Sequence, residues 1–207
     1  MRYRTLWNQP LERARVTYPF ITWDGQFTEE QCNEISAYCQ VKSNMKAGTT
    51  FGGADQTVRV SDVAFHGWSE EISWVFEKLH QAITSINDRW YGFDLNGYNG
   101  FQYTEYDGEK LGKYDWHMDM HLGNGDAPPD MFETRKLSLS LLLNEPGQDY
   151  EGGDFQLNTG SEGRTMTVEC RKGRIIAFPS WVIHRVTPVT KGVRRSLVVW
   201  VVGPKFT

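Results

Sequence analysis

The chain has few cysteines, no cysteine pair motif and no long apolar run. Its 207 residues include only Cys32, Cys39 and Cys170, none in a Cys-x-x-Cys arrangement. An odd, sparse count argues against a disulfide framework and favours a reducing compartment. The N-terminus lacks the apolar core of a signal peptide. The longest apolar run, 197–202, is far shorter than the ~20 residues that a membrane span needs. We therefore expect a cytoplasmic protein that does not enter the membrane.

A strong excess of one charge is also absent. The formal net charge is −4, from 26 acidic and 22 basic residues. This balance gives no electrostatic footprint for non-specific nucleic-acid binding, although a local basic groove stays open. Aromatic residues make up 14% of the chain, which excludes a disordered protein. The length suits a single domain spanning 1–207, because domains typically run to ~100–200 residues.

Two helices are predicted in the first half of the chain. Thr28 is a favourable N-cap for a helix over 28–40, with acidic residues in its first turn and apolar residues at helical spacing. Ser69 is the corresponding cap for a longer amphipathic helix over 69–90. The glycine-containing stretch 42–56 between them indicates a loop, and 59–65 indicates a strand.

The second half of the chain changes to short strands separated by glycine-containing turns. Turns are predicted at 107–108, 151–153, 172–173 and 191–192. The expected strands are 101–106, 116–122, 136–143, 154–157, 166–168, 174–178, 184–189 and 194–202. Regularly spaced short strands favour a jelly roll or barrel, with the earlier helices packed on one face. The expected fold is α+β but mainly β, with helical support over about 1–95 and a jelly-roll core over about 96–203.

One strand-like run carries the sequence His117-Met118-Asp119. Side chains at positions i and i+2 of a strand point to the same face, so an imidazole and a carboxylate would converge. His184 begins a later strand that could neighbour this one. Two histidines and one carboxylate leave metal positions open, which suits non-haem Fe(II). By itself the His-x-Asp pattern is weak, since a surface strand pair explains it equally well.

Arg194 and Ser196 strengthen this interpretation. They lie on the strand after His184 and share one face, on which a guanidinium and a hydroxyl can clamp a carboxylate. An inward arginine among apolar neighbours is costly without an anionic partner. Arg195 faces the opposite way and is expected to be a surface charge.

At this point the sequence resembles the Fe(II)- and 2-oxoglutarate-dependent oxygenases of the prolyl 4-hydroxylase-like type. That family carries His-x-Asp, a distal histidine and a basic residue about ten positions later. Four segments agree with it in order and spacing, and the stretch from His184 to Arg194 is very similar to bacterial PKHD-type hydroxylases. The segments are 100–108, 114–119, 137–155 and 184–200.

The resemblance implies a double-stranded β-helix in which His117, Asp119 and His184 bind Fe(II). It implies Arg194 as the partner of the distal carboxylate of 2-oxoglutarate, with O2 as co-substrate, and it leaves ascorbate open as an additional cofactor. The implied reaction is hydroxylation of a substrate C–H bond, with release of succinate and CO2. The implied substrate is a prolyl residue in a protein or peptide.

Further residues are expected around the cofactor. Some animal members of the family place a tyrosine, which also bonds the co-substrate, where this chain has Leu141; Ser196 or Ser138 would stand in for it. Tyr106 would face inward and contact co-substrate or substrate, and Trp200 would wall the pocket. Tyr114 and His121 are weaker candidates, His121 as a third ligand in competition with His184. The stretches 42–56 and 123–135 flank the site and are expected to be lids or plain loops.

Other functions remain open at this stage. Nucleic-acid demethylation is disfavoured, because those enzymes typically have an arginine six residues after the co-substrate arginine, where this chain has Trp200. A non-catalytic jelly-roll module would not need all four site residues, and a zinc hydrolase needs no carboxylate clamp. Small-molecule oxygenation of the same type stays an alternative. The oligomeric state cannot be inferred from the sequence.

Overall fold

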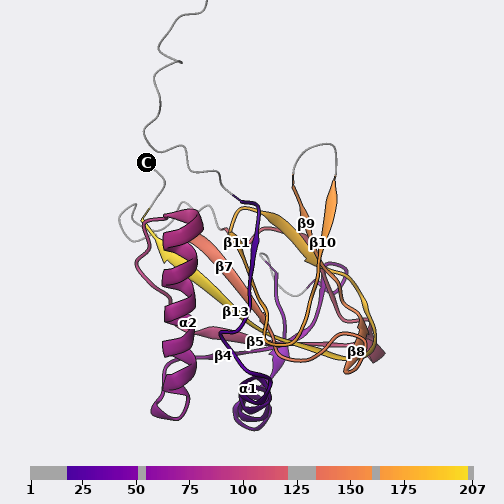
Figure 1. Cartoon of the computed structure of the whole chain (residues 1–207). Helices are drawn as coiled ribbons and strands as arrows, with labels where there is room; N and C mark the ends of the chain where they lie inside the picture. The colour runs from indigo at the N-terminus through magenta and orange to yellow at the C-terminus, as the bar shows by residue number, and fades with distance from the viewer. Residues whose placement is uncertain (1–17, 51–54, 121–133, 160–163, 205–207) are drawn as a thin grey trace, which may run out of the picture.

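The computed structural model describes residues 18–50, 55–120, 134–159 and 164–204, and these form two facing β-sheets with helices against one of them (Figure 1). The helical elements are α1 (Glu29–Lys42), η2 (Glu70–Ile72), α2 (Ser73–Ile86), η3 (Asn87–Tyr91) and η4 (Gly108–Lys110). The strands are β1 (Ile21–Trp23), β2 (Lys46–Ala47), β3 (Arg59–Val60), β4 (Asp62–His66), β5 (Phe101–Asp107), β6 (Lys113–His117), β7 (Thr134–Leu142), β8 (Tyr150–Gly152), β9 (Phe155–Asn158), β10 (Thr165–Val168), β11 (Ile175–Pro179), β12 (Ile183–Val186) and β13 (Val189–Gly203).

The large sheet has the strand order β1-β11-β7-β13-β5-β4-β2, and β8 pairs with β13 beside it. The small sheet has the order β10-β9-β12-β6-β3, and every pairing of named strands in both sheets is antiparallel. Helix α2 lies along one side of the large sheet, whereas β9 and β10 lie on the other (Figure 1). The predicted fold class, mainly β with helices flanking a jelly roll, is confirmed.

Strand alternation divides the large sheet into a packed face and a cavity face. On β7 and β13, Leu139, Leu141, Leu197 and Val199 are at most 1% exposed and pack into the core with both helices. Their neighbours in sequence point into the space between the two sheets, because successive strand side chains alternate. Arg194 and Ser196 on β13 and Ser140 on β7 therefore face the second sheet. A smaller apolar cluster, including Phe155 from β9, lines the same space.

Helix α1 begins as its sequence predicts. Thr28 is the N-cap, its hydroxyl accepts from the Gln31 backbone N–H at 3.3 Å, and the Gln31 side chain accepts from the Thr28 N–H at 3.1 Å. This reciprocal pair is a capping box.

Thr28→Ala is expected to lower the free energy of unfolding by ~1 kcal/mol and the melting temperature by about 2–4 °C. Thermal unfolding measures this; Thr22→Ala, in an exposed strand position, is the control.

The second predicted helix differs from the structure in its ends. The segment 69–90 is divided into the 3-10 turn η2, helix α2 and the π-helical turn η3, which ends at Gly92 in the left-handed conformation, with φ 61°. Ser69 occupies the N-cap position of η2, as predicted, but its buried hydroxyl makes no capping hydrogen bond within the described residues.

Several strand predictions also need correction. The single strand predicted over 59–65 is two strands in different sheets, since Ser61 separates β3 from β4. The predicted turns at 151–153 and 191–192 are partly wrong, because β8 occupies 150–152 and β13 continues through Gly192 as one strand of 15 residues. Short strands β1 and β2 were not predicted, the latter within the stretch expected to be a loop.

None of the helices in the described segments is both long and apolar enough to cross a lipid bilayer.

Candidate active site

The space between the two sheets contains a cavity of about 280 Å³. Side chains from β3–β7, β9 and β11–β13 surround it, together with residues that directly follow β2 and β6. Its lining includes His117, Asp119, His184, Arg194 and Ser196, so the two sets of candidates chosen from sequence meet in one place.

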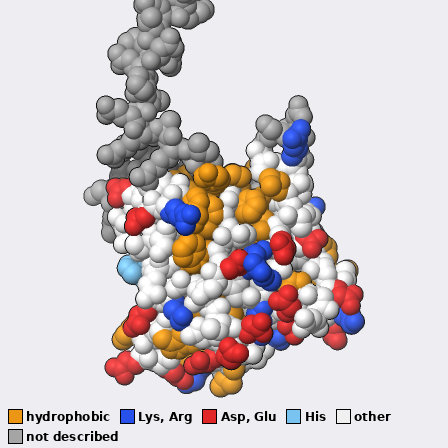
Figure 2. Space-filling model, in the orientation of Figure 1, with side chains coloured by type: hydrophobic (Ala, Val, Ile, Leu, Met, Phe, Trp, Pro, Cys, Tyr) orange, Lys and Arg blue, Asp and Glu red, His pale blue; other side chains and the backbone are white. Residues whose placement is uncertain are grey.

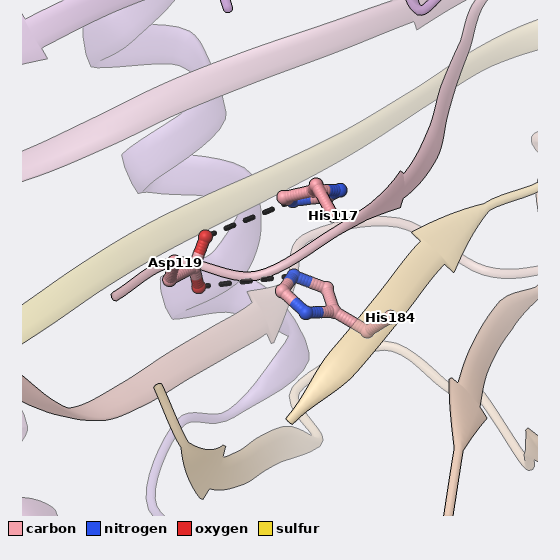
Figure 3. A group of neighbouring side chains, drawn as sticks. All are labelled: His117, Asp119 and His184. Carbon is pink, nitrogen blue, oxygen red and sulfur yellow. Dashed lines mark ion pairs between the residues drawn. The ribbon is translucent and has the colours of Figure 1, made fainter. Parts of the chain in front are cut away.

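His117, Asp119 and His184 converge at this cavity. One ligand atom from each lies within 4.8 Å of the other two. Nε2 of His117 is 3.7 Å from Oδ1 of Asp119, and Nε2 of His184 is 3.7 Å from its Oδ2 (Figure 3). The strands β6 and β12 pair with His117 directly opposite His184, which brings residues 67 positions apart onto adjacent strands. Figure 3 shows both imidazoles turned toward the carboxylate.

Backbone carbonyls set which nitrogen of each histidine faces the carboxylate. Nδ1 of His117 lies 2.8 Å from the Asp115 carbonyl oxygen, and Nδ1 of His184 lies 3.0 Å from that of Val182. A carbonyl only accepts, so each Nδ1 carries the proton and donates it. Each Nε2 therefore presents its lone pair toward Asp119, as a metal ligand requires.

The ionisation states of His117 and Asp119 also suit a cation. Burial, together with the neighbouring His184, lowers the pKa of His117 to about 3, so its imidazole is neutral at neutral pH. Burial acts to raise the pKa of Asp119, but the adjacent His184 and His117 outweigh it, with contributions from the Ser138 hydroxyl and the Trp200 indole. The pKa of Asp119 is lowered overall, so the carboxylate is ionised.

Asp119 reaches this position differently from the prediction. Strand β6 ends at His117, and Asp119 lies in the bend that follows, so strand alternation does not orient it. Its backbone N–H donates to the Ser180 carbonyl oxygen at 2.9 Å instead. The Ser180 hydroxyl also pairs with that of Ser138, at 2.9 Å. A backbone anchor from the β11–β12 connection therefore holds the carboxylate in place.

Arg194 is 1% exposed and is among the largest fully buried side chains. Among the described residues no carboxylate lies within 4.0 Å of its guanidinium, its Nε has no hydrogen-bond partner, and its Nη1 donates to the Ser196 hydroxyl at 3.3 Å. Tyr106 lies below it, with 5.5 Å between the guanidinium carbon and the ring centre. A buried cation without a counter-ion is costly, so this position is suited to an anionic ligand.

Arg195 lies on the other face of β13, as predicted. Its Nε donates to the Glu105 carboxylate at 2.9 Å, and Glu105 is its direct partner across the β13–β5 ladder. Within the described segments, Arg195 thus contacts a carboxylate and Arg194 does not.

The residues present fit both Fe(II) and 2-oxoglutarate. Two imidazole nitrogens and one carboxylate are the donor set of mononuclear non-haem iron sites, and they leave other positions open. The guanidinium of Arg194, which has no carboxylate partner among the described residues, supplies donors for the distal carboxylate of a dicarboxylic acid.

Some of the remaining residues predicted from the sequence line the cavity, and others do not. Tyr106, Ser196, Tyr114 and Trp200 line the cavity. Ser138 does not: its hydroxyl lies against Ser180, whereas Ser140, two residues later, is among the lining residues. His121, residues 51–54 of the first expected lid and 123–133 of the second lie outside the described residues.

Two cavity residues were missed as site residues, namely Arg59 and Arg135. In the sequence, Arg59 is only the first residue of the predicted strand 59–65, and Arg135 is only the end of the flanking stretch 123–135. The sequence feature that both share is a basic residue at the start of a strand whose other residues favour burial.

Gly153 is packed against Arg194 in a way that allows a test. Its φ is +66°, and a Cβ there would lie 2.9 Å from Cδ of Arg194 and 2.8 Å from Cγ2 of Val189. Gly153→Ala is expected to displace the guanidinium and raise the KM for 2-oxoglutarate several-fold. Gly147→Ala is the matched control, because Gly147 has φ +76° but nothing within 4 Å of the added Cβ. Equal KM values for the two variants would show that the Arg194 contact is unimportant.

Comparison with known proteins gives consistent results. A sequence profile described as the 2OG-Fe(II) oxygenase superfamily matches residues 101–202. A PKHD-type hydroxylase from Synechococcus sp. strain CC9605 is 32% identical over 191 residues, which cover 91% of this chain and 70% of that protein. One from Alteromonas mediterranea is 35% identical over 88 residues, covering 42% of this chain and 37% of the relative. In the first five curated relatives the match spans only about a third of their own length.

Solved structures share the fold. A prolyl 4-hydroxylase from Pseudomonas putida superposes with a TM-score of 0.70 at 21% identity, covering 91% of this chain and 95% of that one. A prolyl hydroxylase from Trichoplax adhaerens, in complex with a hypoxia-inducible-factor peptide fragment, gives 0.69 at 18% identity, with 89% and 83% covered. A viral collagen prolyl hydroxylase in complex with 2-oxoglutarate gives 0.64 at 16% identity, with 90% and 97% covered.

Proposed function

The chain belongs to the 2OG-Fe(II) oxygenase superfamily, as a PKHD-type member, and we propose that it hydroxylates a prolyl residue in a protein or peptide. Fe(II) and 2-oxoglutarate are the cofactors, and O2 is the co-substrate. The observation that carries the proposal is that a two-histidine, one-carboxylate cluster shares its cavity with a buried arginine that has no carboxylate partner in the described part of the chain.

The roles of the residues follow from their contacts. His117, Asp119 and His184 hold the metal, with the two histidines fixed by the carbonyls of Asp115 and Val182. Arg194 binds the distal carboxylate of 2-oxoglutarate, and Ser196, which already accepts from it, orients the guanidinium. When bound, iron and 2-oxoglutarate supply the oxidising chemistry, which yields succinate, CO2 and a hydroxylated substrate.

The cavity wall serves that chemistry by excluding water and positioning the substrate. Phe155 and Phe178 pack around His184, with ring centres 5.5 Å and 4.5 Å from the imidazole centre. Tyr114 stacks on His117 with 3.4 Å between ring centres. Apolar and aromatic surroundings limit water at the metal and give a pyrrolidine ring a surface to lie against.

A prolyl substrate is supported by the structural relatives, which include prolyl hydroxylases that share this fold. One of them is described with a peptide fragment, which agrees with an elongated substrate crossing the cavity mouth. Nucleic acid and small molecules are the competing substrate classes of the superfamily.

Two measurements test the proposal in sequence. First, the protein is incubated with 2-oxoglutarate and O2, with and without Fe(II), and succinate is quantified. We expect Fe(II)-dependent succinate formation; its absence would support a non-catalytic module.

Second, proline-containing peptides and host-cell proteins are analysed by mass spectrometry for gain of one oxygen atom. Oxygen gained at another residue, or on an oligonucleotide, would contradict a prolyl substrate.

A further inference from the structure

The cavity contains two more arginines, Arg59 and Arg135, which the proposed chemistry does not use. Arg59 comes from β3 in the small sheet, and Arg135 comes from β7 in the large sheet. In the part of the chain that the structure describes, no carboxylate lies within 4.0 Å of either guanidinium. Both stand over aromatic rings that adjoin the metal ligands.

Arg59 is 8% exposed and lies on the His117 side of the cavity. Its guanidinium carbon is 4.5 Å from the ring centre of Tyr114, which in turn stacks on His117. Its Nε donates to the Ser61 hydroxyl at 2.8 Å and its Nη1 to the Thr49 carbonyl oxygen at 3.1 Å. These neutral partners fix the direction of the guanidinium but leave its charge unbalanced.

Arg135 lies on the Asp119 side of the cavity. Its guanidinium carbon is 4.2 Å from the ring centre of Trp200, and its Nη1 reaches the backbone carbonyl oxygen of Asp119 at 3.4 Å. A second guanidinium is thus held beside the metal ligands with only a neutral contact.

With Fe(II) and 2-oxoglutarate bound, the positive charges of the cavity would outnumber its negative charges. Fe(II) and the 2-oxoglutarate dianion cancel, and the single negative charge of Asp119 offsets only one of the three arginines that line the cavity. Among the described residues that line the cavity, two positive charges therefore remain in excess. Two positive charges near a low-dielectric cavity attract an anion and repel a cation.

We propose that Arg59 and Arg135 bind a carboxylate of the substrate, so that the site selects a peptide with an aspartate or glutamate close to the hydroxylated residue. This inference rests on the proposed function and names its substrate class. The ring of Tyr114 lies between Arg59 and His117, and Arg135 reaches the backbone of Asp119 directly. An extended peptide advances about 3.3 Å per residue, so an acidic side chain within about two residues of the target can reach them.

The rim of the cavity agrees with a peptide rather than with a free anion. Phe65 on β4 is 71% exposed, lines the cavity, and lies 6.4 Å from Trp200 between ring centres. Met118, between two of the candidate ligands, is 47% exposed. Apolar side chains beside two cations match a segment with both apolar and acidic residues. Figure 2 shows hydrophobic side chains gathered near the upper edge of one face, among charged ones of both signs.

The test compares capped peptides that contain one proline and differ at a single flanking position, which is Glu, Gln or Lys. Binding is measured by fluorescence or calorimetry to protein loaded with Zn(II) and 2-oxoglutarate, so that no turnover is needed. We expect the Glu peptide to bind at least ~tenfold more tightly than its Gln match, as for charge-assisted hydrogen bonds, and the Lys peptide most weakly. Raising the salt concentration should reduce the difference.

Variants assign the preference to these arginines. Arg59→Gln and Arg135→Gln should each reduce the Glu-to-Gln affinity ratio, and the double variant should bring it close to one. Arg89→Gln is the matched control: Arg89 also stands over a tryptophan, Trp90, at 4.7 Å, but does not line the cavity. A ratio is read within each variant, so a general loss of binding or stability does not imitate the result.

Each outcome supports or overturns the inference. Wild-type protein with equal affinity for Glu and Gln peptides, or a double variant that retains the preference, overturns it. If glutamate or another free amino acid binds more tightly than every acidic peptide, the substrate is not a peptide. If a single-stranded oligonucleotide binds more tightly than the acidic peptides, the arginines do not select a carboxylate. Failure of the proposed function appears separately, as absent Fe(II)-dependent succinate formation by the wild-type protein.

Discussion

Replacing Asp119 with alanine is expected to abolish turnover. Asp119 supplies the single anionic ligand of the proposed iron site, and both histidine Nε2 atoms are 3.7 Å from its carboxylate. Mutating an outer partner of a metal ligand typically lowers metal affinity or activity by ~10–100-fold, so losing a ligand itself should exceed that range. The measurement is Fe(II) content after dialysis together with the rate of succinate formation.

The fold should survive this substitution, because the apo protein loses a buried charge rather than a packed apolar group. Asp62→Ala is the control, since Asp62 lies in an exposed ion pair with Lys110 that is worth ~0–1 kcal/mol. Wild-type iron content and succinate formation in Asp119→Ala would remove Asp119 from the site. If Asp119→Ala does not fold, the same measurements are made on Asp119→Asn, which keeps the shape of the side chain but not its charge.

The second large effect is expected at Arg194. Arg194→Ala should raise the KM for 2-oxoglutarate at least ~tenfold while altering iron affinity much less, because a charge-assisted contact contributes ~1.5–3 kcal/mol. Arg195→Ala is the adjacent control and should change KM little, since Arg195 already pairs with Glu105 on the opposite face. Similar KM values for the two variants would show that the assignment of faces is wrong.

The stability of an Arg194 variant separates binding from packing. The buried guanidinium has no carboxylate partner among the described residues, so Arg194→Met should leave the melting temperature of the protein without cofactors unchanged or raise it. In the wild-type protein, 2-oxoglutarate should raise the melting temperature, and in the variant this increase should be lost. A variant that is strongly destabilised without cofactors would instead indicate a structural role for Arg194.

Much of the fold was predictable because local signals and tertiary packing agree. Thr28 followed by Gln31 satisfies the first backbone donors of α1 without help from other elements. On β13, alternation of Arg194 and Ser196 with apolar residues matches a strand with one packed and one cavity face. These signals lie within a few residues, so the sequence shows them directly.

The remaining features depend on contacts between distant residues. Asp119 is oriented by the carbonyl oxygen of Ser180, 61 positions away, rather than by strand alternation. Arg59 joins the site because β3 pairs with β6, which no local pattern indicates. Ser69 has the residue type of an N-cap, yet burial leaves its hydroxyl without a bond. Tertiary packing decides each of these cases.

The most direct test of the central claim is a crystal structure of the protein grown without oxygen, with Fe(II) and 2-oxoglutarate, using anomalous scattering at the iron edge. The account predicts one strong anomalous peak bound by Nε2 of His117, Nε2 of His184 and the Asp119 carboxylate, with the distal carboxylate of 2-oxoglutarate on Arg194. Iron at another position, or a guanidinium of Arg194 that stays without an anionic partner, would contradict it.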